Sequence, residues 1–372
     1  MYVNQKVFSE MLTSAAANFT PRRALTWGGY AAGLVGMRTL LEGARKVDDF
    51  AFPDWAEQKV EQPVFIFANG RSGTTMLHRL MGLDEENFAG FKLHQSMFSA
   101  VSIQRSIAAL GEGRLAPLWK QGVKTINKTF FDNNAWDGIH AMGIDKEEED
   151  ETTFVYCFES PSLSLLNPFM RNYTRLTWLD SHPEADREAF MDFYEATVKK
   201  HLYSVGGNKR FLNKNVFFAP RVRSMLSRFP DARFVYLLRH PFEALPSFAS
   251  MYHAKWQTHS PELGKATNAS REMIDMGYAY YRAGAALVRD LPEERIRVVR
   301  YPDLVSDPRA VVEGLYDWMS LPMSEPYQAR LNEATRKQRR YQSKHKYSLE
   351  EFGVTEDEVR RELADVFEFF GF

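Results

Sequence analysis

"PVFIFANGRSGTTML", residues 63–77, joins an apolar run to a glycine-containing loop and then to a stretch of helical character. Gly70 and Gly73 allow the backbone to turn several N–H groups toward one point. The dipole of a helix favours an anion at its start, where hydroxyl donors are supplied by Ser72, Thr74 and Thr75. The stretch therefore predicts a strand, a phosphate-binding loop and a helix. A glycine–serine turn that binds no ligand is the alternative interpretation.

The loop lacks the lysine that an ATP-binding loop requires. A Walker loop has the pattern G-x-x-x-x-G-K-[S/T], in which the lysine reaches the outer phosphates and the hydroxyl holds magnesium. The fifth residue after Gly70 is Thr75, and no lysine follows it. The charged residue is instead Arg71, whose guanidinium can bind a phosphate through two hydrogen bonds without a metal. The loop thus predicts a phosphate site that needs no metal ion.

Short apolar runs alternate with longer amphipathic stretches beyond residue 60. Strands are expected at residues 63–67, 210–214, 233–238 and 296–301. Helices are expected at residues 74–81, 219–229, 242–252 and 271–290. Short, nearly continuous apolar strands between helices indicate a parallel sheet with both faces covered. The expected fold class is α/β: a three-layer α/β/α fold like that of P-loop NTPases, with ligands at the carboxyl ends of the strands.

Composition excludes some functions and compartments. The 372 residues carry a net charge of -1, which gives no general attraction to nucleic acid, so we expect no nucleic-acid partner. Cys157 is the only cysteine, which rules out an intrachain disulfide and fits a cytoplasmic location. The acidic run "DKEEEDE", residues 145–151, is interpreted as a solvated helix face or loop rather than a site for a basic acceptor.

The N-terminal part forms a segment of its own in this interpretation. We divide the chain into residues 1–60, a helical and apolar segment, and residues 61–372, a single catalytic domain. Residues 24–41 are mostly apolar, but Arg38 and the short length argue against a full bilayer span. A helix packed on the protein's own body, a peripheral membrane contact, and a span or partner surface remain open. The location is therefore cytoplasmic, with membrane association as an alternative.

A second polar motif follows a different strand. "RFVYLLRHPFEALPSFASMY", residues 233–252, places Arg239 at a strand end and Ser247 eight residues later, in the helix that "HP" would start. An arginine and a hydroxyl can converge there on a second phosphate. Two anion sites on neighbouring strands indicate a nucleotide with two separate phosphate groups.

These motifs resemble the PAPS-dependent sulfotransferases, which use 3'-phosphoadenosine-5'-phosphosulfate as sulfuryl donor. The resemblance covers about residues 60–360 and is strongest to the bacterial-type branch. Recognisable counterparts are "PVFI", "RSGTT", "LHRLM", "FPDARFVYLLRHP", "YPDLVSDP" and "HKYSLEEFG". It implies PAPS as the donor, 3',5'-ADP as the product and no metal.

The resemblance also implies roles for individual residues. Arg71 helps to neutralise the leaving phosphate, and the 5'-phosphosulfate is cradled by Ser72, Gly73, Thr74 and Thr75. Arg239 and Ser247 hold the 3'-phosphate. Tyr301 lies by the adenine, although a strand-end residue that covers the core is the alternative. Lys344, in the basic run "RKQRRYQSKHKYS", is a further phosphate contact, although the chain lacks the G-x-x-G-x-x-K pattern of many cytosolic members.

The chemistry further needs a second cation and a base. Lys214, in "FLNKNVFF", matches the catalytic lysine of cytosolic members, and a lysine merely exposed at a strand end is the alternative. Those members carry a histidine two residues later, but this chain has Val216, so their base cannot be transferred. His94 and His140 are equal candidates for the base, because each lies in a stretch expected near the carboxyl edge of the sheet.

The expected function is sulfuryl transfer from PAPS to a hydroxyl or amine of a small molecule. Aromatic residues between positions 91 and 178 and the apolar segment near the N-terminus suggest a lipid-like acceptor. A P-loop kinase-like phosphotransferase is one alternative, although no convincing magnesium-binding acid ends a strand. A non-catalytic membrane-associated binding protein is another, against which the intact Arg71, Lys214, Arg239 and Ser247 argue. The oligomeric state is open.

Overall fold

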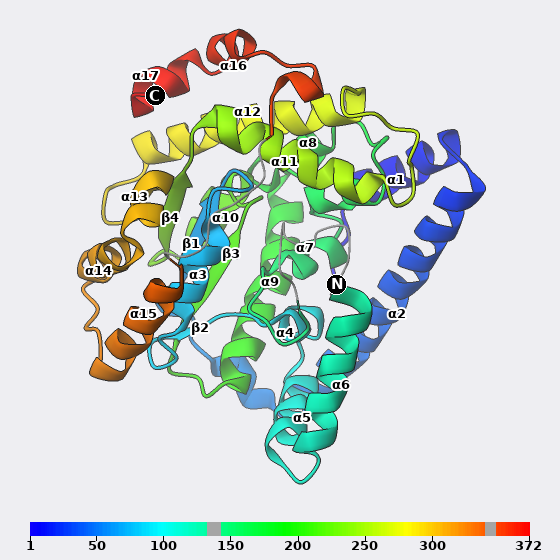
Figure 1. Cartoon of the computed structure of the whole chain (residues 1–372). Coiled ribbons are helices and arrows are strands. Elements are labelled where there is room, and N and C mark those ends of the chain that lie inside the picture. Colours follow the sequence, from blue (N-terminus) through cyan, green and yellow to red (C-terminus); the bar gives the residue numbers. More distant parts are fainter. Residues whose placement is uncertain (132–142, 339–346) are drawn as a thin grey trace.

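The fold is built on one sheet of five parallel strands (Figure 1). The structure is a computed structural model, and it describes residues 1–131, 143–338 and 347–372. Within these residues the strand order is β2-β3-β1-β4-β5. The strands are β1 (Val64–Ala68), β2 (Phe88–Ala89), β3 (Arg210–Asn215), β4 (Arg233–Leu238) and β5 (Ile296–Arg300). Strand β1 is central, with β3 on one side and β4 on the other, so the loop after β1 opens at the carboxyl edge of the sheet, where ligands of such sheets bind.

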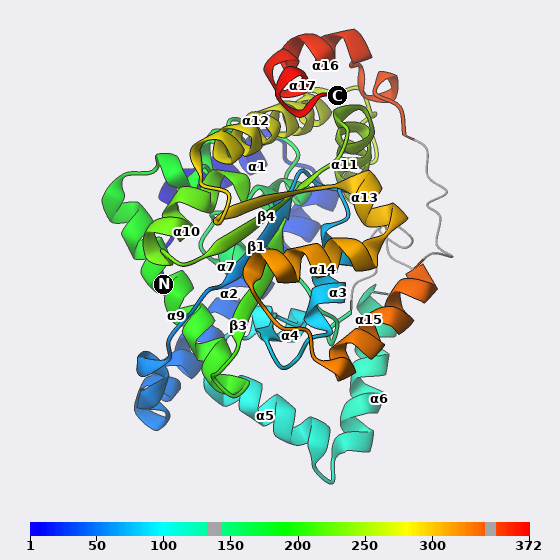
Figure 2. The same cartoon turned by 90° about the vertical axis from the view of Figure 1, so that its left-hand side faces the viewer.

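Helices cover both faces of the sheet. Alternate residues of β1 face opposite ways: Ile66 packs in one apolar cluster, whereas Phe65 and Phe67 pack in the other. The first cluster is completed by α3 (Thr74–Gly82), α14 (Pro308–Met319) and α15 (Glu325–Gln338), which lie together in Figure 2. The second is completed mainly by α9 (Glu184–Ser204), α10 (Val222–Arg228), α11 (Pro241–Trp256) and α12 (Asn268–Asp290). The expected three-layer α/β/α fold is therefore confirmed.

The predicted elements are present, with small shifts at their ends. All four predicted strands form, but β5 ends at Arg300, and Tyr301 begins helix α13 (Tyr301–Ser306) instead of ending the strand. The sequence analysis missed β2, which is only two residues long. The other short helices are α4 (Leu93–Met97), α7 (Glu151–Tyr156), α8 (Tyr173–Leu176), α16 (Glu356–Glu362) and α17 (Ala364–Phe370).

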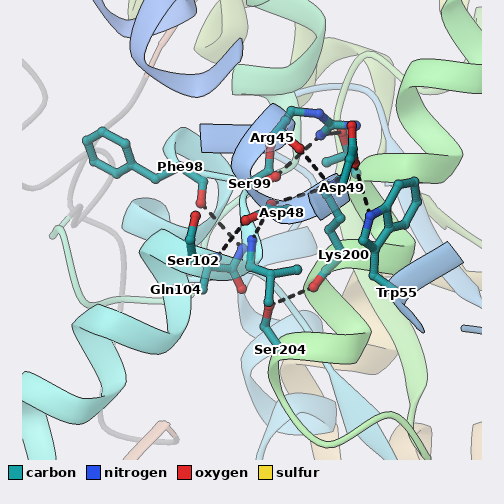
Figure 3. Close-up of polar contacts among 12 residues, drawn as sticks. Arg45, Asp48, Asp49, Trp55, Phe98, Ser99, Ser102, Gln104, Lys200 and Ser204 are labelled. Carbon is teal, nitrogen blue, oxygen red and sulfur yellow. Dashed lines mark hydrogen bonds and ion pairs between the residues drawn. The ribbon is translucent and has the colours of Figure 1, made fainter. Parts of the chain in front are cut away.

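The N-terminal segment forms two helices, α1 (Gln5–Ala17) and α2 (Pro21–Ala51), and α2 lies along the outside of the body (Figure 1). The end of α2 is fixed by Asp48, whose carboxylate accepts hydrogen bonds of 2.8 Å from the backbone N–H groups of Val101 and Ser102 (Figure 3). These groups begin α5 (Val101–Glu112), so Asp48 caps that helix. Lys200 of α9 lies 3.4 Å from the same carboxylate. These contacts attach α2 firmly to α5 and α9.

Among the described residues, no helix combines the length and the apolar character needed to cross a membrane. The division of the chain at residue 60 and the cytoplasmic location stay predictions.

Candidate functional site

The loop after β1 has a backbone that glycine makes possible. A Cβ atom on Gly70 would lie 2.2 Å from a ring carbon of Phe248, so only glycine fits there. Gly73 precedes α3 with a φ of 88°, and Arg71 adopts a φ of 70°, a conformation that costs a residue with a side chain about 1–2 kcal/mol. Strain of this kind persists only where the surrounding structure imposes it. The loop is therefore held in a defined shape at the carboxyl end of the central strand.

Buried donors face this loop without a partner among the described residues. Ser72 is fully buried, and its Oγ has no hydrogen-bond partner. The same holds for Nδ2 of Asn69, which precedes the loop glycine. Thr74 is buried and Thr75 half-buried at the start of α3, where backbone N–H groups have no partner within the helix. Unpaired buried donors at a helix start are what an anion such as a phosphate would satisfy.

The second motif lies directly against the first. Arg239 follows β4, and its Nη1 donates a hydrogen bond of 2.6 Å to the carbonyl oxygen of Arg71. The Nε atom of Arg71 in turn lies 3.3 Å from the Oγ of Ser247, which is buried on α11. The two predicted anion motifs are thus joined by direct contacts.

Tyr301 also lies at this junction. The guanidinium of Arg239 stacks over its ring at 4.4 Å, and its ring atoms would lie 3.1 Å from a Cβ on Gly73. The carbonyl oxygen of Arg239 accepts a hydrogen bond of 2.7 Å from Tyr281, and its Nε pairs with Glu243 at 2.9 Å. The backbone and the side chain of Arg239 are therefore both held in place, and its guanidinium lies against the aromatic ring of Tyr301.

Lys214 lies on β3, beside Ile66 of β1, and its side chain is almost completely buried. Its Nζ contacts Oε1 of Glu149 at 2.6 Å. A lysine merely exposed at a strand end is therefore the wrong interpretation. The ion pair also places a carboxylate at the carboxyl end of the strand next to the loop.

The acidic run 145–151 is the clearest correction. The sequence predicts a solvated helix face or loop, but Glu148 and Asp150 are buried. Asp150 accepts hydrogen bonds from Tyr194 at 2.5 Å and from Asn215 at 2.7 Å, and burial raises its pKa to about 6. Glu151 pairs with the fully buried Arg221 at 3.0 Å. Partners that are distant in the sequence draw the run across the end of β3, which composition alone cannot reveal.

The predicted bases have different outcomes. His94 lies on α4, where its Nδ1 is 2.8 Å from the carbonyl oxygen of Ile144, just before the acidic run, and burial lowers its pKa. His140 and Lys344 lie outside the described residues.

Sequence reasoning missed His78, on α3 one turn beyond the loop. It is fully buried, its Nε2 lies 3.4 Å from the carbonyl oxygen of Leu212, and burial together with the charge of Lys214 lowers its pKa to about 3. His78 is part of the motif "LHRLM", but nothing in that motif predicts that its side chain is buried.

Comparisons with known proteins show the family of the chain and its fold. The model of the sulfotransferase family matches residues 63–325. Two proteins named omega-hydroxy-beta-dihydromenaquinone-9 sulfotransferase Stf3, from Mycobacterium bovis and Mycobacterium tuberculosis, are 25% identical over 285 residues, 73% of this chain. The matched region spans 66% of the length of these relatives.

Two solved structures share the fold. The sulfotransferase STF1 from Mycobacterium tuberculosis H37Rv aligns with a TM-score of 0.76 and 17% identity, over 97% of this chain and 92% of that one. The sulfotransferase STF9 from Mycobacterium avium aligns with a TM-score of 0.70 and 17% identity, over 87% and 80%. The P-loop-like fold predicted from the sequence is thus confirmed. Because the family model covers well over half of the chain, the protein belongs to the sulfotransferase family.

Proposed function

We propose that this protein transfers a sulfuryl group from PAPS to a hydroxyl or amine of a lipid-like small molecule and releases 3',5'-ADP. The observation that carries the proposal is the direct contact between the two anion motifs, in which Arg71 reaches Ser247 and Arg239 reaches the backbone of Arg71. A nucleotide with separate 5' and 3' groups needs two anion sites held at a constant separation, and this junction supports that arrangement.

The loop is assigned to the 5'-phosphosulfate. The unpaired Ser72 hydroxyl, the N–H groups at the start of α3 and the hydroxyls of Thr74 and Thr75 are the donors for it. Arg71 is assigned to the leaving phosphate, because it is the charged residue of the loop and a guanidinium can bind a phosphate through two hydrogen bonds.

The second motif is assigned to the rest of the nucleotide. Arg239 and Ser247 take the 3'-phosphate, and Tyr301 takes the adenine, whose ring can stack on an aromatic face. Lys344 is kept as an additional phosphate contact.

The group transfer breaks the bond between sulfur and the 5'-phosphate oxygen and forms one between sulfur and the acceptor atom, which gives up its proton to a base. Arg71 and Lys214 supply positive charge where the leaving phosphate becomes more negative. We assign the base to Glu149, because its carboxylate contacts Lys214 and its side chain remains 18% exposed. His94 and His140 remain alternatives to it.

The acceptor class rests on the relatives and on composition. The Stf3 proteins carry the name of an omega-hydroxylated menaquinone derivative, a lipid-like alcohol. Phe, Tyr and Trp make up 14% of this chain, which fits an apolar acceptor site.

Two measurements test the proposal. The midpoint temperature of thermal unfolding should rise with 3',5'-ADP but not with ATP and magnesium. A ligand raises this temperature only when it binds the folded state in preference to the unfolded state. Sulfur-labelled PAPS incubated with a lipid extract should then label an extractable product, and the Arg71→Ala variant should label none. Stabilisation by ATP with magnesium instead of 3',5'-ADP would contradict the donor assignment.

A further inference from the structure

The outer side of α2 is an apolar surface that no part of the described chain covers. Leu25 is 81% exposed, Phe50 is 90% exposed, and Val35, Leu40 and Val47 are each more than half exposed. Residues 21–41 contain no acidic side chain. Isolated exposed apolar residues are common, but a row of them along one helix indicates an interaction surface.

A helical hairpin extends this surface. It consists of α5 and α6 (Ala116–Ile126) and lies beside the lower half of α2 (Figure 1). A groove between α2 and α5 is lined by small and apolar side chains, Gly36, Leu40, Val47 and Ile103 among them. Near the turn between α5 and α6, Leu115 and Leu118 are exposed, the latter by 71%.

The hairpin is also strongly basic. Residues 101–128 contain five basic residues and one acidic residue, a net charge of +4 in a chain whose total is -1. The basic residues are Arg105, Arg114, Lys120, Lys124 and Lys128. Exposed leucines beside clustered lysines match the boundary of an anionic bilayer, where apolar groups enter the acyl region and cations meet the headgroups.

We propose that the outer side of α2 and the α5–α6 hairpin together form a docking surface for an anionic lipid bilayer, on which the protein lies without crossing it. The surface is rigid, because the carboxylate of Asp48 ties the end of α2 to the start of α5 and also pairs with Lys200 of α9 (Figure 3).

The hairpin also connects this surface to the candidate site. Asn127, just after α6, donates a hydrogen bond of 2.9 Å to Asp145 and accepts one of 2.8 Å from the N–H of Ile144. Asp145 is the first residue of the acidic run that carries Glu149. A docked bilayer would therefore lie next to the segment that leads to the proposed base.

The test is flotation of the full chain with vesicles of phosphatidylcholine alone or with about one third phosphatidylglycerol. We expect flotation with the anionic vesicles only. Each lysine near such a surface contributes about fivefold to partitioning, so a triple variant should lose about a hundredfold. This variant is Lys120→Gln with Lys124→Gln and Lys128→Gln. A second variant, Leu25→Ser with Leu40→Ser and Phe50→Ser, should lose about as much.

Matched controls separate docking from general effects of charge and polarity. The charge control is Arg223→Gln with Arg297→Gln and Arg309→Gln, and the apolar control is Phe369→Ser on α17, which lies on another side of the molecule (Figure 1). Both should float like the natural chain. Failure of the natural chain to float with anionic vesicles would overturn the proposal. So would a self-association that the α2 variant abolishes, since it would make this face an interface between two copies. Neither result depends on the donor, so the proposed function stands or falls separately.

Discussion

The Nη1 atom of Arg239 donates a hydrogen bond to the carbonyl oxygen of Arg71, and this contact links the ends of β4 and β1. Arg71 has a positive φ, and the charged hydrogen bond to its carbonyl oxygen stabilises this strained conformation. In the proposed function, Arg239 therefore shapes the loop for the 5'-phosphosulfate and binds the 3'-phosphate itself. The contact therefore joins the two proposed anion sites directly.

The Arg239→Gln variant should weaken binding of 3',5'-ADP by about a hundredfold, because charged hydrogen bonds of this kind contribute roughly 2–3 kcal/mol. Arg239→Lys should recover little, since an ammonium group cannot serve the loop carbonyl and a phosphate in the same plane. Isothermal titration calorimetry measures both. Arg282→Gln, which removes an exposed arginine paired with Glu362, is the control and should bind like the natural chain. Unchanged affinity in Arg239→Gln would refute the assigned role.

The Gly70→Ala variant should lose donor binding and some stability. Its new methyl group would lie 2.2 Å from the ring of Phe248, so the ring or the loop must move, at a cost of about 1–3 kcal/mol. Gly314→Ala is the matched control, because that glycine lies within α14 with open space around it and alanine favours a helix by about 0.5–1 kcal/mol. Urea unfolding should therefore show opposite signs for the two. Equal stability of Gly70→Ala and the natural chain would contradict the tight packing of the loop.

The sequence predicted what depends on local pattern and missed what depends on distant partners. Buried strands are continuous apolar runs in the sequence, so their ends can be predicted. The phosphate-binding loop follows one such run and Arg239 follows another, so the sequence located both features. The two residues of β2 carry too little pattern to be recognised. The acidic run around Asp150 predicts a solvated segment. Its burial could not be predicted, because its hydrogen-bond partners, Tyr194 and Asn215, are more than forty positions away in the sequence.

The ion pair of Lys214 and Glu149 should respond to substitution in a way that separates stability from turnover. Glu149→Gln leaves a buried lysine without its counter-charge, which typically destabilises a fold by about 3 kcal/mol. Lys214→Met removes the cation and should abolish turnover. In the double variant, stability should recover, because no unpaired buried charge remains, whereas turnover should stay lost.

Urea unfolding and sulfur-label transfer measure these two effects on the same preparations. Glu195→Gln is the control for Glu149→Gln, since its carboxylate pairs with Lys199 and Arg228 away from the loop. Full turnover in Glu149→Gln would exclude that residue as the base and leave His94 and His140.

Buried histidines should make the protein lose stability in acid. Burial lowers the pKa of His201 and of His78 to about 3, while the unfolded chain protonates near the ordinary value of about 6.5. The unfolded state therefore binds more protons between these values. Each histidine contributes stability above pH 6.5 that is lost as the pH falls, by up to about 1.4 kcal/mol per pH unit. Asp150 acts oppositely, because its pKa is raised from 3.8 to about 6 and its contribution is lost as the pH rises through that range.

The difference between variants isolates these contributions. Between pH 6 and pH 4 the free energy of unfolding of His201→Asn should fall less steeply than that of the natural chain, by about 1.4 kcal/mol per pH unit. Asp150→Asn should fall more steeply, because the opposing group is gone. His201 lies on α9 against Phe91, so the substitution leaves the loop and Lys214 unchanged. Urea unfolding at several pH values measures both slopes, and parallel curves for His201→Asn and the natural chain would show that His201 is protonated equally in the folded and unfolded states.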